Sequence, residues 1–147
     1  MNERKGLEGL LAWQKSMEFA KRIYTDVIPL LPKEEKWVIG SQLRHAASIV
    51  PANMAEGYGR FYFQEGVRFS YIARGSLEEI LTFLTLAKDL NYLPVELFEI
   101  LTSRSIRNKT NYWRLHRFFK EKQTWPVRTR GRNWHWRKSR CVPDYYR

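Results

Sequence analysis

The feature that most limits the fold of this chain is the recurrence of apolar residues at steps of three and four along four long segments. This spacing places apolar side chains on one face of an α-helix, and that face must be buried against other helices. No segment shows a competing strand pattern. The chain is therefore predicted to be all-α.

Four helices are predicted, at about residues 10–31, 34–56, 62–90 and 95–122. The connections between them are only a few residues long, which favours antiparallel neighbours. Asn91 tolerates the left-handed conformation and is predicted to stop the third helix. We expect residues 1–123 to form an up-down-up-down four-helix bundle, followed by a basic, aromatic-rich tail at residues 124–147.

The segment SIVPANMAEGYGR, from Ser48 to Arg60, interrupts this pattern with one proline and two glycines. Pro51 is predicted to kink the second helix, which then stops near Gly57 and turns into the third. A phosphate-binding loop is a weaker interpretation, because GYGR lacks the glycine and lysine spacing of a P-loop and follows no strand. The segment is predicted to be a joint between helices.

Gly75 and Ser76 interrupt the predicted third helix, where glycine costs about 1 kcal/mol relative to alanine. We expect them to allow close approach of a neighbouring helix, near Ala46 and Ala47. A backbone opening for a ligand is the less favoured alternative.

Charge is divided unevenly along the chain. Residues 1–103 hold 12 basic and 13 acidic residues, a balance of −1, whereas residues 104–147 hold 14 basic and two acidic residues, a balance of +12. Such a block is typical of a surface that binds a polyanion. There is no segment of membrane-spanning length, no secretory signal and only one cysteine, Cys141, so we expect a cytoplasmic protein.

Basic and aromatic residues alternate in the last third of the chain, a combination that neutralises phosphates and stacks on bases. The predicted contacts to RNA or single-stranded DNA are Arg104, Arg107, Lys109, Arg114, Arg117, Lys120, Arg128, Arg130, Arg132, Trp134, His135, Trp136, Arg137, Lys138 and Arg140. Alternatively, the aromatic residues dock on another subunit or protein, or the tail is simply solvated. A membrane-surface role ranks last, because the tail has no helical apolar stripe.

Catalysis and metal binding find little support in the sequence. Polar residues of the second and third helices lack a nucleophile beside a base, and the three histidines are far apart. We predict no enzyme activity, no metal and no cofactor. Roles in helix packing or assembly are predicted instead for Pro51, Asn53, Glu56, Gly57, Arg60, Arg74, Gly75 and Ser76.

Three segments resemble successive helices of a known family: LLAWQKSMEFAKRIY, SQLRHAASIVPANMAEGYGR and RFSYIARGSLEEILTFLTLAKDLNYL. This is the four helix bundle protein family known from 23S rRNA intervening-sequence proteins, and the accessory variability proteins of diversity-generating retroelements are similar. The resemblance covers about residues 10–93, and its most specific parts are PANMAEGYGR and IARGSLEE.

The resemblance implies a non-enzymatic bundle that assembles into a homopentameric barrel with a positive surface. The retroelement members bind nucleic acid and partner a reverse transcriptase, so our main expectation is a nucleic-acid-binding adaptor of that kind. The alternative is a structural or assembly protein encoded by a 23S rRNA intervening sequence. This chain departs from the family pattern at Tyr62 and Gly66, which weaken the start of the third helix. We therefore expect residues 60–66 to be mobile or held by a partner.

Overall fold

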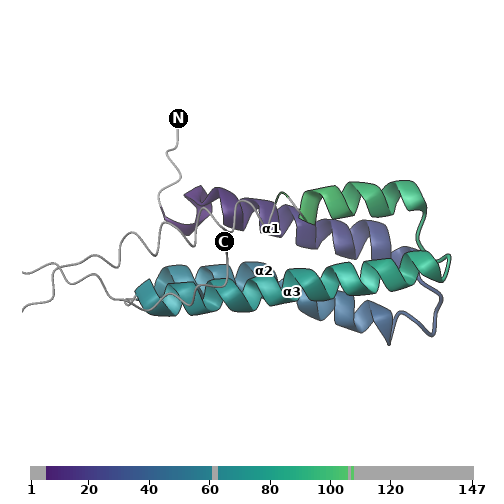
Figure 1. Ribbon diagram of the computed structural model, residues 1–147, viewed down its shortest axis with the longest axis horizontal. Helices are drawn as coiled ribbons and strands as arrows, with labels where there is room; N and C mark the ends of the chain where they lie inside the picture. Colours follow the sequence, from purple (N-terminus) through teal and green to yellow (C-terminus); the bar gives the residue numbers. More distant parts are fainter. Residues whose placement is uncertain (1–5, 61–62, 106, 108–147) are drawn as a thin grey trace, which may run out of the picture.

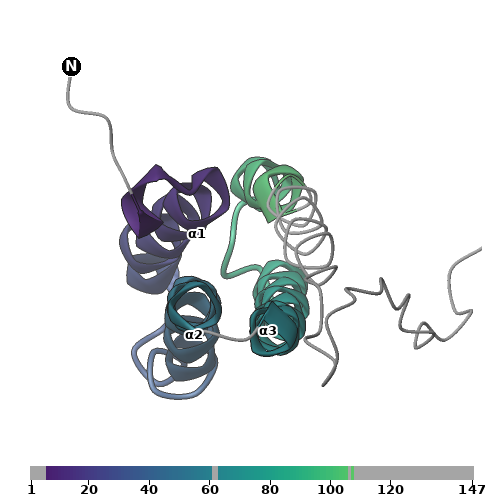
Figure 2. The ribbon, with the colours of Figure 1, turned by 90° about the vertical axis from the view of Figure 1, so that its left-hand side faces the viewer.

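A computed structural model describes residues 6–60, 63–105 and 107. Within these residues every regular element is helical, and no strand occurs. Four helices run alternately up and down (Figure 1) and occupy four corners when seen end-on (Figure 2). The predicted all-α bundle is therefore confirmed.

The first helical segment is not uniform. It contains a short 3₁₀ turn η1 (Leu7–Gly9), the helix α1 (Leu11–Arg22), a π-helical turn η2 (Ile23–Val27) and a second 3₁₀ turn η3 (Ile28–Leu30). Helical structure thus extends to the predicted end, but its pitch changes before Pro29. In a regular helix the proline ring would collide with the carbonyl four residues earlier, and a widened turn accommodates it.

The second helix, α2 (Ile39–Gly59), begins later than the predicted residue 34. The preceding turn is closed by its own hydrogen bonds. The amide of Gly40 donates to the carbonyl of Glu35 at 2.8 Å, and Arg44 Nη2 donates to the carbonyl of Lys36 at 2.7 Å. These bonds satisfy carbonyls before the regular helix starts, an arrangement that periodicity alone does not reveal.

The end of α2 lies close to the predicted stop near Gly57, but the segment from Ser48 to Gly59 is helix and not a glycine turn. The helix continues through the buried Pro51 to Gly59. Neither Gly57 nor Gly59 has a positive φ, so neither is a turn residue. Beside the proline, Asn53 Nδ2 donates to the carbonyl of Ile49 at 2.9 Å and gives that carbonyl an additional donor.

The third helix, α3 (Phe63–Asp89), ends as predicted. Asn91 has a φ of 58°, its amide donates to the carbonyl of Lys88 at 2.9 Å, and the amide of Tyr92 donates to the carbonyl of Ala87 at 2.8 Å. This pair of bonds is a Schellman motif, which satisfies the last carbonyls of a helix. A fourth helix follows from residue 95 and is described to residue 105; the remainder of its predicted length and the tail lie outside the described residues.

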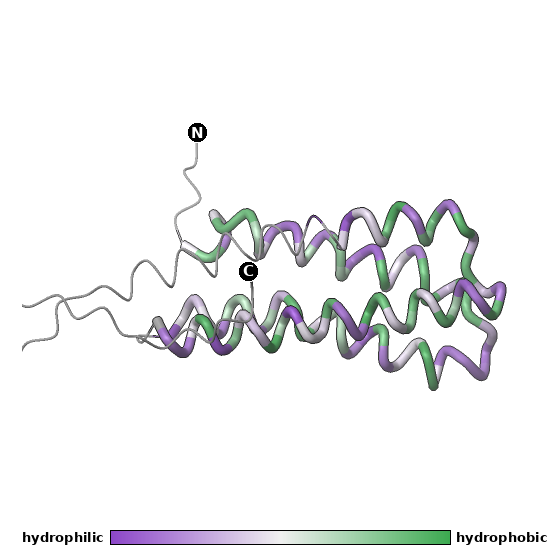
Figure 3. The backbone as a smooth tube through the Cα atoms, in the orientation of Figure 1, coloured by the Kyte–Doolittle hydropathy of each residue, from purple (hydrophilic) through white to green (hydrophobic). Residues whose placement is uncertain are grey.

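All four helices contribute to one core. Its largest fully buried side chains include Ile23 after α1, Leu43 in α2, Leu77 and Ile80 in α3, and Leu101 in the fourth helix. Apolar and polar residues alternate around each helix (Figure 3), as the periodicity predicts.

Candidate assembly and nucleic-acid surfaces

α2 and α3 approach each other closely at Gly57. A Cβ atom built on Gly57 would lie 3.1 Å from Phe69 Cβ, 3.2 Å from Gly66 O and 3.3 Å from Gly66 Cα. Two of these three atoms belong to the backbone of α3, and the third, Phe69 Cβ, is fixed to that backbone. None of them can move away by a change of side-chain rotamer. Gly57 and Gly66 therefore serve to bring two helices together, and Gly66 has a packing role that offsets its weak helix propensity.

Gly75 does not have the predicted role. It is exposed, and no atom lies within 4 Å of a Cβ built on it. The neighbouring Ser76 is buried, and its hydroxyl donates to the carbonyl of Ile72 at 3.4 Å. The close approach between helices that was predicted at Gly75 of α3 is found instead at Gly57 of α2.

Arg60 connects the end of α2 to the start of α3. Its guanidinium pairs with Glu56, lies 3.8 Å from Glu65 through Nε, and sits 5.3 Å from the centre of the Phe69 ring. Local contacts thus hold Arg60 between the two helices, while residues 61 and 62 lie outside the described part. Farther along α3, the half-buried Arg74 lies 5.9 Å from the Tyr71 ring.

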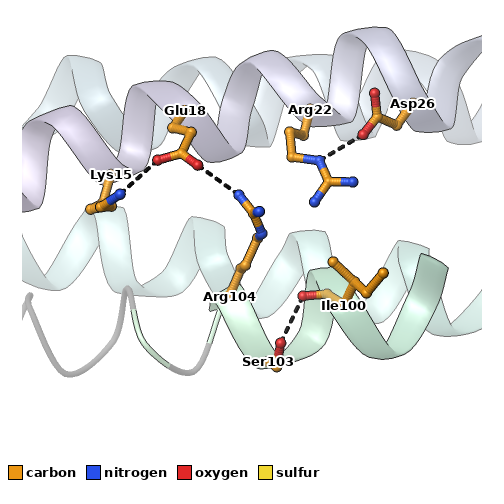
Figure 4. A network of polar contacts seen from close by, with 7 residues as sticks. All are labelled: Lys15, Glu18, Arg22, Asp26, Ile100, Ser103 and Arg104. Carbon is orange, nitrogen blue, oxygen red and sulfur yellow. Dashed lines mark hydrogen bonds and ion pairs between the residues drawn. The ribbon is translucent and has the colours of Figure 1, made fainter. Parts of the chain in front are cut away.

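A different kind of contact joins α1 to the fourth helix (Figure 4). Arg104 Nη1 lies 2.7 Å from Glu18 Oε1, and Lys15 Nζ lies 2.8 Å from the other oxygen of the same carboxylate. One turn farther along α1, Arg22 Nε lies 2.6 Å from Asp26 Oδ2. The carboxylate of Glu18 therefore pairs with one basic side chain from α1 and one from the fourth helix.

These contacts lower the pKa of both carboxyl groups. The pKa of Glu18 falls mainly because of the hydrogen bond from Lys15 and then that from Arg104. The pKa of Asp26 falls because of hydrogen bonds from Thr25 and from Arg22. Both carboxylates are thus ionised partners in a partly solvated network.

Two of the predicted nucleic-acid contacts lie within the described residues. Arg104 is engaged by Glu18, whereas Arg107 is exposed. The others lie outside the described residues: Lys109, Arg114, Arg117, Lys120, Arg128, Arg130, Arg132, Trp134, His135, Trp136, Arg137, Lys138 and Arg140.

The described part of the chain contains no group of three or more His, Cys, Asp or Glu side chains that could hold a metal ion. Nor does any helix among those residues combine the length and apolar character needed to cross a bilayer.

Sequence reasoning missed two features. The pair between Glu18 and Arg104 spans 86 positions, so no local pattern reveals it. A hollow on the surface of α2 is lined by Ala52, Ala55, Glu56, Gly59 and Arg60. The small residues of PANMAEGYGR are the sequence signal for this hollow.

The protein-family model for the 23S rRNA-intervening sequence protein matches residues 8–110, well over half of the chain. The chain belongs to this family. The match confirms the resemblance found in the sequence and extends it into the fourth helix, past Arg104 and Arg107. It ends before Arg114, so the family model does not cover most of the basic block. No curated protein matches the chain in a sequence comparison. The similarity to retroelement accessory proteins stays a prediction.

Proposed function

We propose that this protein is a non-enzymatic helical scaffold that acts by assembling with copies of itself. Membership in the 23S rRNA-intervening sequence family supports this function. The charged residues between α2 and α3 support the non-enzymatic part of this proposal. Glu56 and Arg60 could have formed part of a reactive site, but they pair with each other and brace the helix junction.

The test is the molar mass of the full-length chain in solution, measured by light scattering over a range of micromolar concentrations. Self-assembly predicts a mass several times that of the 17.7 kDa chain, and the family resemblance implies five copies. A mass of one chain at all concentrations would refute the proposal.

A second candidate function is binding of RNA or single-stranded DNA through the last third of the chain. It is favoured by the excess of 14 basic over two acidic residues from Arg104 onward. Phosphate contacts release counterions, so affinity should fall steeply with salt. Partnership with a reverse transcriptase belongs to this candidate.

The second candidate is tested by titrating a single-stranded RNA against the full chain and against a form ending at Lys122, at several salt concentrations. We expect the shortened form to bind more weakly and to show a smaller dependence of log K on log salt. Equal affinities and equal slopes would exclude the tail as the binding element.

Point variants refine the same experiment. Arg107→Gln should reduce the salt slope by roughly one unit if Arg107 contacts a phosphate. Arg104→Gln should change it less, because Glu18 already engages that guanidinium.

A further inference from the structure

The outer side of α3, which occupies one corner of the bundle (Figure 2), carries a regular stripe of residues. The α3 stripe follows alternate steps of four and three along the helix: Arg68, Ile72, Gly75, Glu79, Thr82 and Leu86. Glu79 is half-buried and the others are exposed, with Ile72 and Leu86 each 43% exposed. This spacing keeps side chains in line on a helix and is typical of the seam between two helices that pack side by side.

Gly75 lies within the α3 stripe, and no packing contact within the chain explains it. No atom lies within 4 Å of a Cβ built on Gly75, and its φ is not positive. Glycine is a weak helix former, yet neither a close approach nor a turn requires it at this place. A position without a side chain on an outer helix face leaves room for a side chain from another molecule.

The charges of the α3 stripe are divided between its two ends. Arg68 lies before Gly75, and Glu79 lies after it. Within the described part of the chain, neither Arg68 nor Glu79 takes part in an ion pair or a side-chain hydrogen bond. The exposed Glu78 adds a second acid beside Glu79, which disfavours a polyanion at this end. A second copy of α3 in the opposite direction, in contrast, would place a base against an acid at both ends.

One antiparallel register satisfies the charges and the glycine together. Place Arg68 of one copy opposite Glu79 of the other. Ile72 comes four residues after Arg68, and Gly75 comes four residues before Glu79, so Ile72 then lies opposite Gly75. The two-fold relation repeats both pairings. The exposed Ile72 side chain thus meets the one position of the stripe that has no side chain, as a knob meets a hole.

We propose that two copies of this protein pair through the α3 stripe, with Ile72 of each copy against Gly75 of the other. This inference rests on the proposed self-assembly and names a surface for it. Because both copies use the same patch, the contact closes with two copies. On its own it produces a dimer, and in a ring built through another surface it would pair two rings.

The first test reverses the charges of the stripe in the full-length chain. Arg68→Glu leaves two acids on the stripe, and Glu79→Arg leaves two bases, so each variant alone places like charges opposite each other. Association measured by sedimentation should weaken by about 10-fold or more for each variant. An equimolar mixture of the two variants should associate about as tightly as the parent, because the acids of one copy then face the bases of the other.

Recovery in the mixture distinguishes this contact from a loss of folding, because a misfolded variant would not recover. Glu99→Arg is the matched control, since it reverses one charge at an exposed position of the fourth helix and should associate as the parent does. A mixture that associates no better than its two components would overturn the proposal.

The second test fills the space at Gly75. Gly75→Gln introduces a better helix former, so it should raise the free energy of unfolding, measured at concentrations where the chain is a monomer. The same substitution should weaken association by about 10-fold, because the glutamine side chain occupies the place of Ile72. A purely local role of Gly75 would change stability and leave association unchanged, which would refute the contact.

The outcomes separate this inference from the proposed function. If the parent chain is monomeric at all concentrations, both self-assembly and the α3 contact are refuted. If the parent assembles and all three variants assemble equally well, only the α3 contact is refuted. A change in RNA affinity without a change in association would show that the stripe binds a polyanion, and would also refute it.

Discussion

Two seams of the bundle are built on different principles. Between α2 and α3, Gly57 meets the backbone of Gly66, and the contact depends on the absence of a side chain. Between α1 and the fourth helix, the contact seen at the surface depends on long charged side chains, with Glu18 held by Lys15 and Arg104. The stability of the first seam should respond to the addition of a single methyl group, and that of the second seam to salt and to acid.

This difference has an energetic consequence. A close-packed interior is destabilised by even a small change in side-chain volume. An exposed ion pair, in contrast, contributes only about 0.2–1 kcal/mol to stability. The free energy of unfolding should therefore respond more to changes at Gly57 than to the loss of any single charge at the other seam.

The largest effect is expected for Gly57→Ala. The added Cβ would press on the α3 backbone, and overpacking of this kind costs about 1–3 kcal/mol, offset in part by the better helix propensity of alanine. We expect a net loss of about 1–2 kcal/mol, measured by urea unfolding. Gly75→Ala is the matched control: its Cβ meets no atom within 4 Å, so it should gain about 0.5–1 kcal/mol. Equal effects of the two substitutions would contradict the assignment of the close contact to Gly57.

Arg60→Ala should have the next largest effect. It removes one cation–π contact and two partly exposed ion pairs, together worth about 1 kcal/mol. Amide exchange should accelerate locally at the end of α2 and the start of α3. Arg68→Ala, at an exposed position of α3, serves as the control. Unchanged exchange around Arg60 would show that these contacts do not hold the junction.

A smaller effect is expected for the pair between α1 and the fourth helix. A double-mutant cycle with Glu18→Gln and Arg104→Gln should give a coupling of about 0.5 kcal/mol at low salt. In 1 M salt, where the screening length is only about 3 Å, the coupling should nearly vanish. The loss at Gly57 should persist in the same salt. A coupling that is insensitive to salt would contradict the solvated character of this seam.

The smallest effect is the acid dependence. The pKa of Glu18 and that of Asp26 lie below their ordinary values of 4.5 and 3.8, so both groups favour the folded state when ionised. Their contribution is fully present above about pH 4.5 and is lost as the pH falls through the lowered values. Because both carboxylates are partly exposed, each should contribute only a few tenths of a kcal/mol. Between pH 7 and pH 3, the Tm of the parent chain should fall slightly more than the Tm of the Glu18→Gln variant. Parallel curves of Tm against pH would contradict the prediction.

Some features of this protein were encoded locally. The positions of the helices follow from apolar spacing, and the stop at Asn91 follows from the backbone preference of one residue. Family membership was likewise evident from local motifs such as PANMAEGYGR and IARGSLEE. Signals of this kind act within a few residues and need no knowledge of the partner helix.

Tertiary structure decided the rest. Glycine has no side chain, so its role depends on what faces it: Gly57 meets a backbone and Gly75 meets open space, although both lie within helices. The start of α2 depends on a bond from Arg44 back to the preceding turn, and Arg104 is engaged by a carboxylate 86 positions away. By itself, the sequence determined which segments are helical and which family they form. Only the folded bundle determined which small and charged residues meet, because those contacts join atoms that are distant along the chain.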